Sequence, residues 1–254
     1  NIFFDKNDGI ASNTTIINGK EVINYASYNY LGLSGHPFVN ASTIAAIEKY
    51  GTSVSASRLV SGDKPLHEML EQSIANFIGT EDCIIMSAGH ATNVNVISHL
   101  FTEKDLILHD ELAHNSLVQG SIFSKATRVA FKHNNWQSVE HILSTRRQHY
   151  EKAVIIIEGI YSMDGDIADL LEFMRIKKAY NSLIMVDEAH SIGTIGQKGR
   201  GISEYFAINP KDIDIMMGTI SKSLASCGGY IAGSKELIEY IKYTCPGFIF
   251  SAGI

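Results

Sequence analysis

Leu183-Ile184-Met185-Val186-Asp187-Glu188-Ala189-His190 is the stretch of sequence that decides the fold. Its uninterrupted apolar run predicts a strand that is buried on both faces, and such strands are typical of parallel sheets. The run ends in an acid, and a histidine follows shortly afterwards. In open α/β sheets, ligands bind at the edge where the strands end. The stretch therefore predicts an α/β protein with a functional site beside Asp187.

The same alternation extends to both sides of this stretch. Further apolar runs predict strands at residues 83–86, 106–108, 128–131, 154–157, 213–217 and 230–232. Segments of helical periodicity follow them at residues 114–123, 136–145, 168–179 and 235–243, with one more helix opening near residue 89. Strands that alternate with helices predict a mostly parallel central sheet with helices on both faces.

The first part of the chain has a different character. Residues 1–50 are predicted to form an N-terminal arm, and residues 51–254 a large α/β domain. Asn18-Gly19 between residues 14–17 and 22–25 predicts a β-hairpin. Pro37 and Pro65 each open a predicted helix. The apolar stripe of the second helix is predicted to consist of Leu66, Leu70, Ile74 and Phe77, with Gly79 ending the helix.

Composition excludes several classes of protein. Of the 254 residues, 45% are hydrophobic and 19% charged, as in ordinary soluble globular proteins. The net charge of −6 argues against a nucleic-acid partner, which needs a basic surplus. No apolar run approaches the roughly 18–20 residues of a membrane span. Cys83, Cys227 and Cys245 form no CxxC pair, which favours a reducing, cytoplasmic setting.

Lys222 stands in the second informative stretch, Gly218-Thr219-Ile220-Ser221-Lys222-Ser223. Most lysines are solvated surface groups, but this one has almost no charged neighbours in the sequence. A desolvated lysine has a lowered pKa, and its free amine can form a Schiff base with an aldehyde. Lys222 therefore points to pyridoxal phosphate (PLP) as a cofactor.

Asp187 and His190 suit the same cofactor. A carboxylate beside the pyridine nitrogen keeps the ring protonated, and the protonated ring accepts electrons. The alternatives are an acid that caps the next turn and a structural histidine. The letters DEAH at 187–190 also occur in helicases, but those enzymes need an upstream GxxxxGK[ST] loop. The given sequence has no such loop, and its acidic net charge also argues against that class.

Other strand ends carry further candidates. Gly89-His90 lies between a strand and a helix, where backbone N–H groups can bind phosphate. His109, Glu111 and His114 lack the HExxH spacing and a fourth ligand, so we predict no metal site. A cap on the next helix, or an imidazole that faces a cofactor ring, is favoured for His114. Arg58 ends a hydroxyl-rich loop that is either flexible or faces the substrate.

Several motifs, in this order along the chain, resemble those of the α-oxoamine synthases, a family of fold-type I PLP enzymes. The residues of these motifs are most similar to those of the serine palmitoyltransferases in this family. The resemblance covers about residue 25 to residue 254. The motifs lie at residues 27–33, 87–93, 158–166, 186–191, 199–201, 218–223 and 228–230. The resemblance implies the large domain of a fold-type I PLP-dependent transferase. The family's small C-terminal domain is expected to be absent, so we expect a truncated chain.

The resemblance also assigns catalytic roles. Lys222 is expected to hold PLP as a Schiff base and later to move the Cα proton of the substrate. Asp187 is expected to bind the ring nitrogen, and His114 to stack on the ring. Ser162 and His190 are expected near the ring hydroxyl.

The cofactor phosphate has its own expected partners. Gly89, His90 and Thr219 are expected to hold it within one chain, although many family members have an aromatic residue in place of His90. The resemblance further implies that Ser251 reaches the phosphate of the partner subunit. We therefore expect a homodimer with shared active sites.

The implied reaction is a decarboxylative condensation. A small amino acid, with serine favoured over glycine or alanine, would react with an acyl thioester of CoA or of an acyl-carrier protein. The products would be an α-amino ketone, carbon dioxide and free thiol. Two alternatives stay open: another fold-type I PLP enzyme, such as an aminotransferase or a lyase, and a truncated, non-catalytic subunit-like protein.

Overall fold

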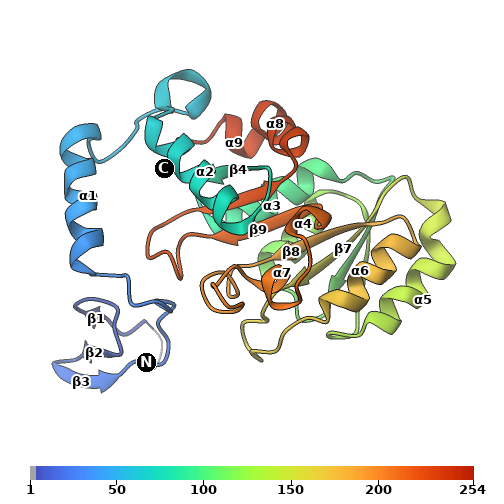
Figure 1. The fold of residues 1–254 in the computed structure, drawn as a ribbon, viewed down its shortest axis with the longest axis horizontal. Coiled ribbons are helices and arrows are strands. Elements are labelled where there is room, and N and C mark those ends of the chain that lie inside the picture. Colours follow the sequence, from blue (N-terminus) through green and yellow to red (C-terminus); the bar gives the residue numbers. More distant parts are fainter. Residues whose placement is uncertain (1–3) are drawn as a thin grey trace.

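The computed structural model describes residues 4–254, so the first three residues of the predicted arm lie outside it. A seven-stranded sheet forms the centre of the molecule (Figure 1). Its strands, in spatial order, are β4 (Asp82–Met86), β10 (Gly229–Gly233), β9 (Ile215–Thr219), β8 (Leu183–Asp187), β7 (Ala153–Glu158), β5 (Leu106–Asp110) and β6 (Thr127–Phe131). Only β10 runs antiparallel to its neighbours β4 and β9. The mostly parallel sheet that the sequence predicts is therefore confirmed.

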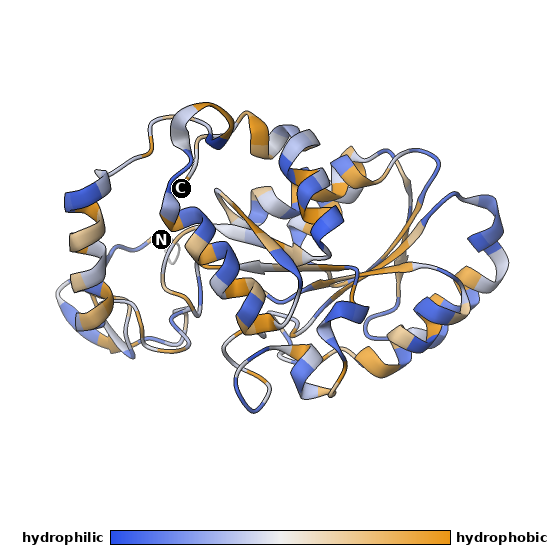
Figure 2. Cartoon of the chain, turned by 45° about the horizontal axis from the view of Figure 1, so that its top comes forward, coloured by the Kyte–Doolittle hydropathy of each residue, from blue (hydrophilic) through white to orange (hydrophobic). Residues whose placement is uncertain are grey.

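Helices cover both faces of this sheet, as predicted. One face carries α2 (Pro65–Ile78), α5 (Trp136–Arg146), α6 (Leu170–Ala179) and α7 (Ile202–Tyr205). The other face carries α3 (Gly89–Leu100), α4 (Asn115–Phe123), α8 (Lys235–Thr244) and α9 (Pro246–Ile249). Figure 2 shows the hydrophobic strands at the centre between helices of mixed hydropathy.

Strand β7 shows why the sheet is buried on both sides. All of its residues are buried. Ile155 and Ile157 pack into the core on one face, while Val154 and Ile156 pack into the core on the other. Because successive side chains of a strand point to opposite faces, an unbroken apolar run suits a sheet covered twice.

The N-terminal segment forms its own small sheet. Strands β1 (Asn7–Asp8), β2 (Thr14–Ile17) and β3 (Lys20–Ile23) pair antiparallel, and the predicted hairpin turns at Asn18-Gly19. Both turn residues have positive φ, which these residue types tolerate. Strand β3 begins at Lys20 rather than at the predicted residue 22, because Lys20 and Ile17 still pair across the turn.

Helix α1 (Pro37–Tyr50) follows this small sheet and has no buried residue. Figure 1 shows α1 standing away from the central sheet. The boundary that we predicted at residue 50 is not tested by the fold and stays a prediction. Shorter helical turns lie at η1 (Arg58–Gly62), η2 (Arg147–His149) and η3 (Pro210–Asp212). Within residues 4–254, no helix combines the length and the apolar character that crossing a membrane requires.

The buried face of α2 differs from the predicted stripe. Leu66 and Phe77 are 40% and 41% exposed, so the prediction was wrong for these two residues. The buried residues of α2 are His67, Glu71, Ile74, Ala75 and Ile78. The helix is rotated in this way because Glu71 satisfies buried polar groups that lie beneath it.

Arg58 is the main partner of Glu71. Its guanidinium pairs with both carboxylate oxygens of Glu71 and, at 2.7 Å, with Asp63. Glu71 also accepts the backbone N–H of Ile85 at 2.9 Å. The Arg58 guanidinium lies 5.3 Å from the centre of the Phe248 ring. The Arg58 side chain is therefore held by the fold, and the two alternatives for the loop that it ends stay predictions.

Candidate active site

A polar cavity of about 190 Å³ lies where the parallel strands β7, β8 and β9 end. Titratable side chains from separate parts of the sequence meet in it. Its walls are formed by Gly89, His90, Asn93, His114, Ser116, Glu158, Asp187, Ala189, His190, Met217, Thr219, Ser221 and Lys222. The cavity therefore occupies the edge of the sheet at which the sequence predicts a site.

Lys222 is the chemically unusual group of this cavity. Its Nζ lies 2.7 Å from Nε2 of His190 and 5.4 Å from the centre of the Tyr28 ring. No carboxylate of the described chain forms an ion pair with it. Burial lowers the pKa of Lys222, and the charges of Asp187 and Glu158 oppose that shift only in part. An amine in this position is available as a nucleophile and as a base.

Asp187 ends β8 and is almost completely buried. Its Oδ2 accepts a hydrogen bond of 2.8 Å from Nδ2 of Asn93, and its Oδ1 accepts one of 3.0 Å from the backbone of Ala189. Asn93 also donates to Ser116 at 2.9 Å, while its own Oδ1 has no partner among residues 4–254. The motif at residues 87–93 includes Asn93, but the sequence assigns it no role.

His114 serves both as a helix cap and as a wall of the cavity. It precedes α4, and its Nδ1 lies 2.7 Å from the hydroxyl of Ser116. Burial lowers its pKa; Asp187 opposes this shift, while Lys222 and His90 add to it. The ring is therefore neutral near pH 7 and lines the cavity without a charge. The two roles that the sequence left open for His114 are both compatible with this position.

Glu158 lies beside Asp187, as its register partner on the neighbouring strand β7. Its Oε1 accepts the backbone N–H of His114 at 2.6 Å. Burial raises the pKa of Glu158 well above its usual range, and the adjacent charge of Asp187 adds to the shift. Glu158 directly follows the predicted strand at residues 154–157, but the sequence gives no reason to expect its carboxyl group beside that of Asp187.

Gly89 and Thr219 lie close together in the wall of the cavity. A Cβ added to Gly89 would lie 3.0 Å from Oγ1 of Thr219, so only glycine leaves this space open. Helix α3 begins at Gly89, and its first backbone N–H groups lack partners within the helix. Such groups favour an anion, and a phosphate fits this chemistry.

His190 links Lys222 to the N-terminal segment. The phenolic oxygen of Tyr30 lies 2.7 Å from its Nδ1, opposite the contact to Lys222. Burial lowers the pKa of His190 to about 4, with further contributions from Lys222 and His114. The motif at residues 27–33 therefore reaches the cavity, which the sequence did not predict for any one of its residues.

The structure brings most of the predicted site residues together. Those that line the cavity are Gly89, His90, His114, Asp187, His190, Thr219 and Lys222. Ser162 is exposed in the turn after β7, and Ser251 donates its hydroxyl to the carbonyl of Gly247 at 2.7 Å. Neither lines the cavity of its own chain, and the roles assigned to these two residues stay predictions.

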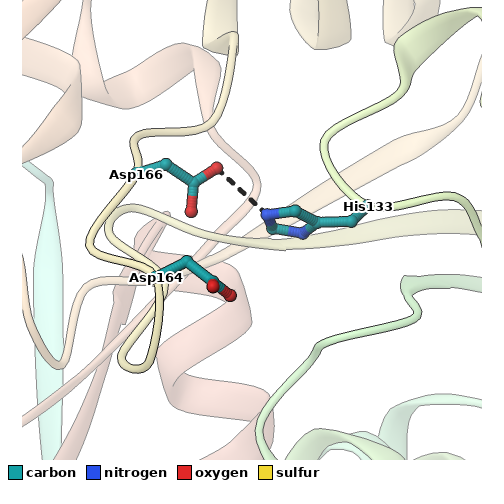
Figure 3. Close-up of side chains that lie close together, drawn as sticks. All are labelled: His133, Asp164 and Asp166. Carbon is teal, nitrogen blue, oxygen red and sulfur yellow. Dashed lines mark hydrogen bonds and ion pairs between the residues drawn. The ribbon is translucent and has the colours of Figure 1, made fainter.

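A second polar cluster lies near the same edge (Figure 3). His133 bridges Asp110 at 2.9 Å and Asp166 at 3.1 Å, and Asp164 lies alongside. Burial lowers the pKa of His133, but the hydrogen bonds and charges of Asp110 and Asp166 outweigh it and raise the pKa above its usual value. Because carboxylates already bind both ring nitrogens, the cluster ties the loop after β6 to the loop after β7.

The chain is similar to known proteins in sequence and in fold. The family model for class I and II aminotransferases matches residues 20–254. Over 247 residues the chain is 39% identical to 8-amino-7-oxononanoate synthase of Geotalea daltonii, covering 97% of this chain and 63% of that protein. Over 244 residues it is 46% identical to serine palmitoyltransferase 3 of Caenorhabditis elegans, covering 91% of this chain and 48% of that protein. The chain thus spans less than two thirds of the length of these relatives.

Solved structures with the same fold include a serine palmitoyltransferase of Sphingomonas wittichii. It matches with a TM-score of 0.91 and 32% identity over 95% of this chain and 60% of that one. Another, described as serine palmitoyltransferase with a PLP internal aldimine, has a TM-score of 0.90, 33% identity and coverage of 95% and 60%. The 8-amino-7-oxononanoate synthase of Francisella tularensis has a TM-score of 0.75 and 26% identity, with coverage of 91% and 64%.

Proposed function

Because the chain belongs to the class I and II aminotransferase family, and within it to the α-oxoamine synthases, we propose that it carries the PLP site of an acyltransferase. This enzyme condenses a small amino acid with an acyl thioester and releases carbon dioxide and free thiol. The observation that carries the proposal is the desolvated amine of Lys222, held in one cavity with the buried acid Asp187.

The residues present fit PLP. Lys222 can hold its aldehyde covalently, and Asp187 can hold its ring nitrogen. The neutral ring of His114 can lie against the pyridine. The backbone N–H groups at the start of α3, beside Gly89, can bind the phosphate. When bound, PLP withdraws electrons from the carbon atom that must lose its proton.

The remaining chemistry belongs to side chains of this chain. The lowered pKa of Lys222 leaves its amine able to take the Cα proton from the amino acid and to return it at the end. His190, at 2.7 Å, holds that amine in place. Burial and the neighbouring Asp187 both raise the pKa of Glu158, which favours its protonated form and limits the negative charge around the reacting centre.

Serine is the proposed amino acid. Two comparisons support it: the 46% identity to a serine palmitoyltransferase, and TM-scores of 0.91 for such an enzyme and 0.75 for an 8-amino-7-oxononanoate synthase. The full-length protein, loaded with PLP, should be titrated with serine, glycine and alanine while the cofactor absorbance is recorded. We expect half-saturation at the lowest concentration with serine. A stronger response to glycine or alanine would contradict this choice.

The reaction class has a separate test. With serine and an acyl-CoA or an acyl-carrier protein thioester, the full-length protein should release carbon dioxide and free thiol in equal amounts. A keto acid without free thiol would instead identify an aminotransferase. Borohydride treatment should fix the cofactor mass on the peptide that contains Lys222. If that mass is found on another lysine, the assignment of Lys222 is wrong.

We further propose that two copies share their active sites through Ser251. This residue does not line the cavity of its own chain, and α1 exposes large apolar side chains that a second copy would cover, among them Phe38, Ile44 and Ile47. Mixing a Lys222→Ala variant with a Ser251→Trp variant should restore activity in the mixed dimer, because one of its two sites is intact. Sedimentation as a monomer at all concentrations would contradict the proposal.

A further inference from the structure

Tyr30 reaches the reacting amine through a single imidazole ring. The phenolic oxygen lies 2.7 Å from Nδ1 of His190, and Nε2 of the same ring lies 2.7 Å from Nζ of Lys222. The three side chains come from distant parts of the sequence: Tyr30 precedes α1, His190 follows β8, and Lys222 follows β9. Both ring nitrogens of His190 have a hydrogen-bond partner. Nε2 contacts the amine of Lys222, which takes part in the proposed reaction, and Nδ1 contacts the phenol of Tyr30, which does not.

We propose that Tyr30 is a positioning residue, whose hydroxyl fixes the ring of His190 so that Nε2 stays the hydrogen-bond partner of Lys222 in both protonation states of the amine. Tyr30 acquires this importance from the proposed function, in which Lys222 takes up and releases a proton. Its own hydroxyl contacts His190 in the wall of the cavity and does not contact the amine.

The reason lies in the inventory of donors and acceptors. A neutral imidazole has one N–H donor and one acceptor nitrogen, and an ammonium group can only donate. When Lys222 is protonated, Nε2 must accept, so Nδ1–H must donate to the Tyr30 oxygen. When Lys222 is neutral, Nε2–H can donate to the amine, and Nδ1 then accepts from the Tyr30 hydroxyl. A phenol can do both, whereas a phenylalanine ring can do neither.

The electrostatics of the two groups agree with these roles. Burial raises the pKa of Tyr30, with a further contribution from Tyr28, so the phenol keeps its proton at neutral pH. Burial, Lys222 and His114 lower the pKa of His190 to about 4, so its ring is neutral. The hydrogen-bond chain therefore needs no ionised member besides Lys222 itself.

Other groups also face Lys222, and the test must leave them unchanged. Asp187 and Glu158 approach it from the ends of β8 and β7, and both raise its pKa. His114 and His90 lie across the cavity, at the starts of α4 and α3. A Tyr30→Phe substitution alters none of these groups.

The test measures the titration of Lys222 in the full chain without added PLP. The rate of acetylation by trace acetic anhydride is followed against pH by mass spectrometry, with the exposed Lys235 as internal reference. In Tyr30→Phe we expect the midpoint for Lys222 to fall by about one pH unit, because the ammonium form loses a well-held acceptor. The midpoint for Lys235 should not move.

Tyr28→Phe is the matched control. The Tyr28 ring lies 6.1 Å from that of His190 and 5.4 Å from Nζ of Lys222, yet its hydroxyl has no hydrogen-bond partner within residues 4–254. Removing this hydroxyl should leave the midpoint of Lys222 unchanged. An equal shift in both variants would overturn the role of Tyr30, as would an unchanged midpoint in Tyr30→Phe.

A double-mutant cycle shows whether the effect runs through His190. In a His190→Ala background, Tyr30→Phe should add no further shift, and additive shifts would refute the connection. Should Tyr30→Phe fail to fold, ¹⁵N NMR of His190 in the unaltered protein decides the same point. As the pH falls through the midpoint of Lys222, the ring proton should move from Nε2 to Nδ1. A constant tautomer would overturn the proposal.

The outcome is separable from that of the proposed function. Acetylation and NMR require no cofactor and no substrate. Suppose that Tyr30→Phe shifts the titration midpoint of Lys222 but the unaltered protein forms no α-amino ketone. That result would refute the proposed reaction and support the role of Tyr30. Condensation without a shift in Tyr30→Phe would refute the role of Tyr30 alone.

Discussion

At the scale of single residues, the site depends on groups that hold its reactive members in place. Asn93 is one of them, because it is the side chain that donates to Asp187 within the described chain. Its amide also reaches Ser116, which in turn contacts Nδ1 of His114. One buried amide thus orients an acid and, through a hydroxyl, the imidazole opposite.

Asn93→Ala should weaken the binding of PLP. The variant removes a hydrogen bond to a buried carboxylate, and such bonds contribute about 1.5–3 kcal/mol, so we expect the Kd for PLP to rise by roughly tenfold or more. The measurement is a titration of apoprotein with PLP followed by absorbance. Asn95→Ala is the control on the same helix, because Nδ2 of Asn95 donates to the carbonyl of Ala91. Equal losses in the two variants would contradict the role of Asn93.

His133 should make stability depend on pH. Its pKa is raised in the folded state, so the stabilisation is fully present below the unfolded pKa of about 6.5 and is lost as the pH rises through the higher folded value. We therefore expect the free energy of unfolding to decrease over that window. Urea unfolding at a series of pH values measures it.

His133→Gln should flatten this part of the pH profile. His149→Gln is the matched control, since His149 is exposed and forms no ion pair with any described residue. A decline of the same size in His133→Gln and in the unaltered protein would show that another group causes it. His133 connects two loops and is not proposed to bind PLP. The pH dependence of the free energy of unfolding should therefore be the same with and without PLP.

The sequence predicts the reactive residues better than it predicts their supports. Lys222 and Asp187 stand out because each interrupts or ends an apolar run, and the strand order brings them together. Asn93 and Tyr30 carry no such signal, because a single polar residue in a helix or loop is ordinary. Their partners lie far away in the sequence, and only the fold shows them.

At the scale of elements, strands were easier to predict than the faces of helices. The sequence segments that predicted β5, β7 and β8 contain only apolar residues. The bounds of each observed strand differ from the predicted ones by one or two residues. Helix α2 shows the limit of periodicity. The face that packs against the sheet contains two polar residues, His67 and Glu71, and the buried ion pair of Glu71 with Arg58 holds this face inward.

Arg58→Met should destabilise the protein by about 3–5 kcal/mol, because it leaves the nearly buried carboxylate of Glu71 without its ionic partner. Urea unfolding measures this change. The double variant Arg58→Met, Glu71→Leu should recover part of the loss, since it removes both charges. Leu66→Ala on the exposed side of α2 is the control and should cost less than about 1 kcal/mol. A small effect of Arg58→Met would show that the pair does not fix α2.

At the scale of the whole molecule, the architecture explains why one edge of the sheet carries the chemistry. The parallel strands β7, β8 and β9 deliver Glu158, Asp187 and Lys222 to the same edge, and α3 adds its N-terminus after β4, which β10 separates from β9. Fold class follows from the alternation of strands and helices alone. The antiparallel direction of β10 does not follow from the sequence, because a short run of small and apolar residues is compatible with either strand direction.

The position of β10 has a consequence for biosynthesis. Within the seven-stranded sheet, β4 pairs with β10 alone, and β10 is the last of these strands to leave the ribosome. While the nascent chain grows, β4 has no partner, and the N-terminus of α3 that follows it has no fixed place opposite Thr219. In chains stalled on the ribosome before residue 229, hydrogen exchange should show unprotected β4 amides and protected β7 and β8 amides. The capacity to hold an anion would then be the last property that a newly made molecule acquires.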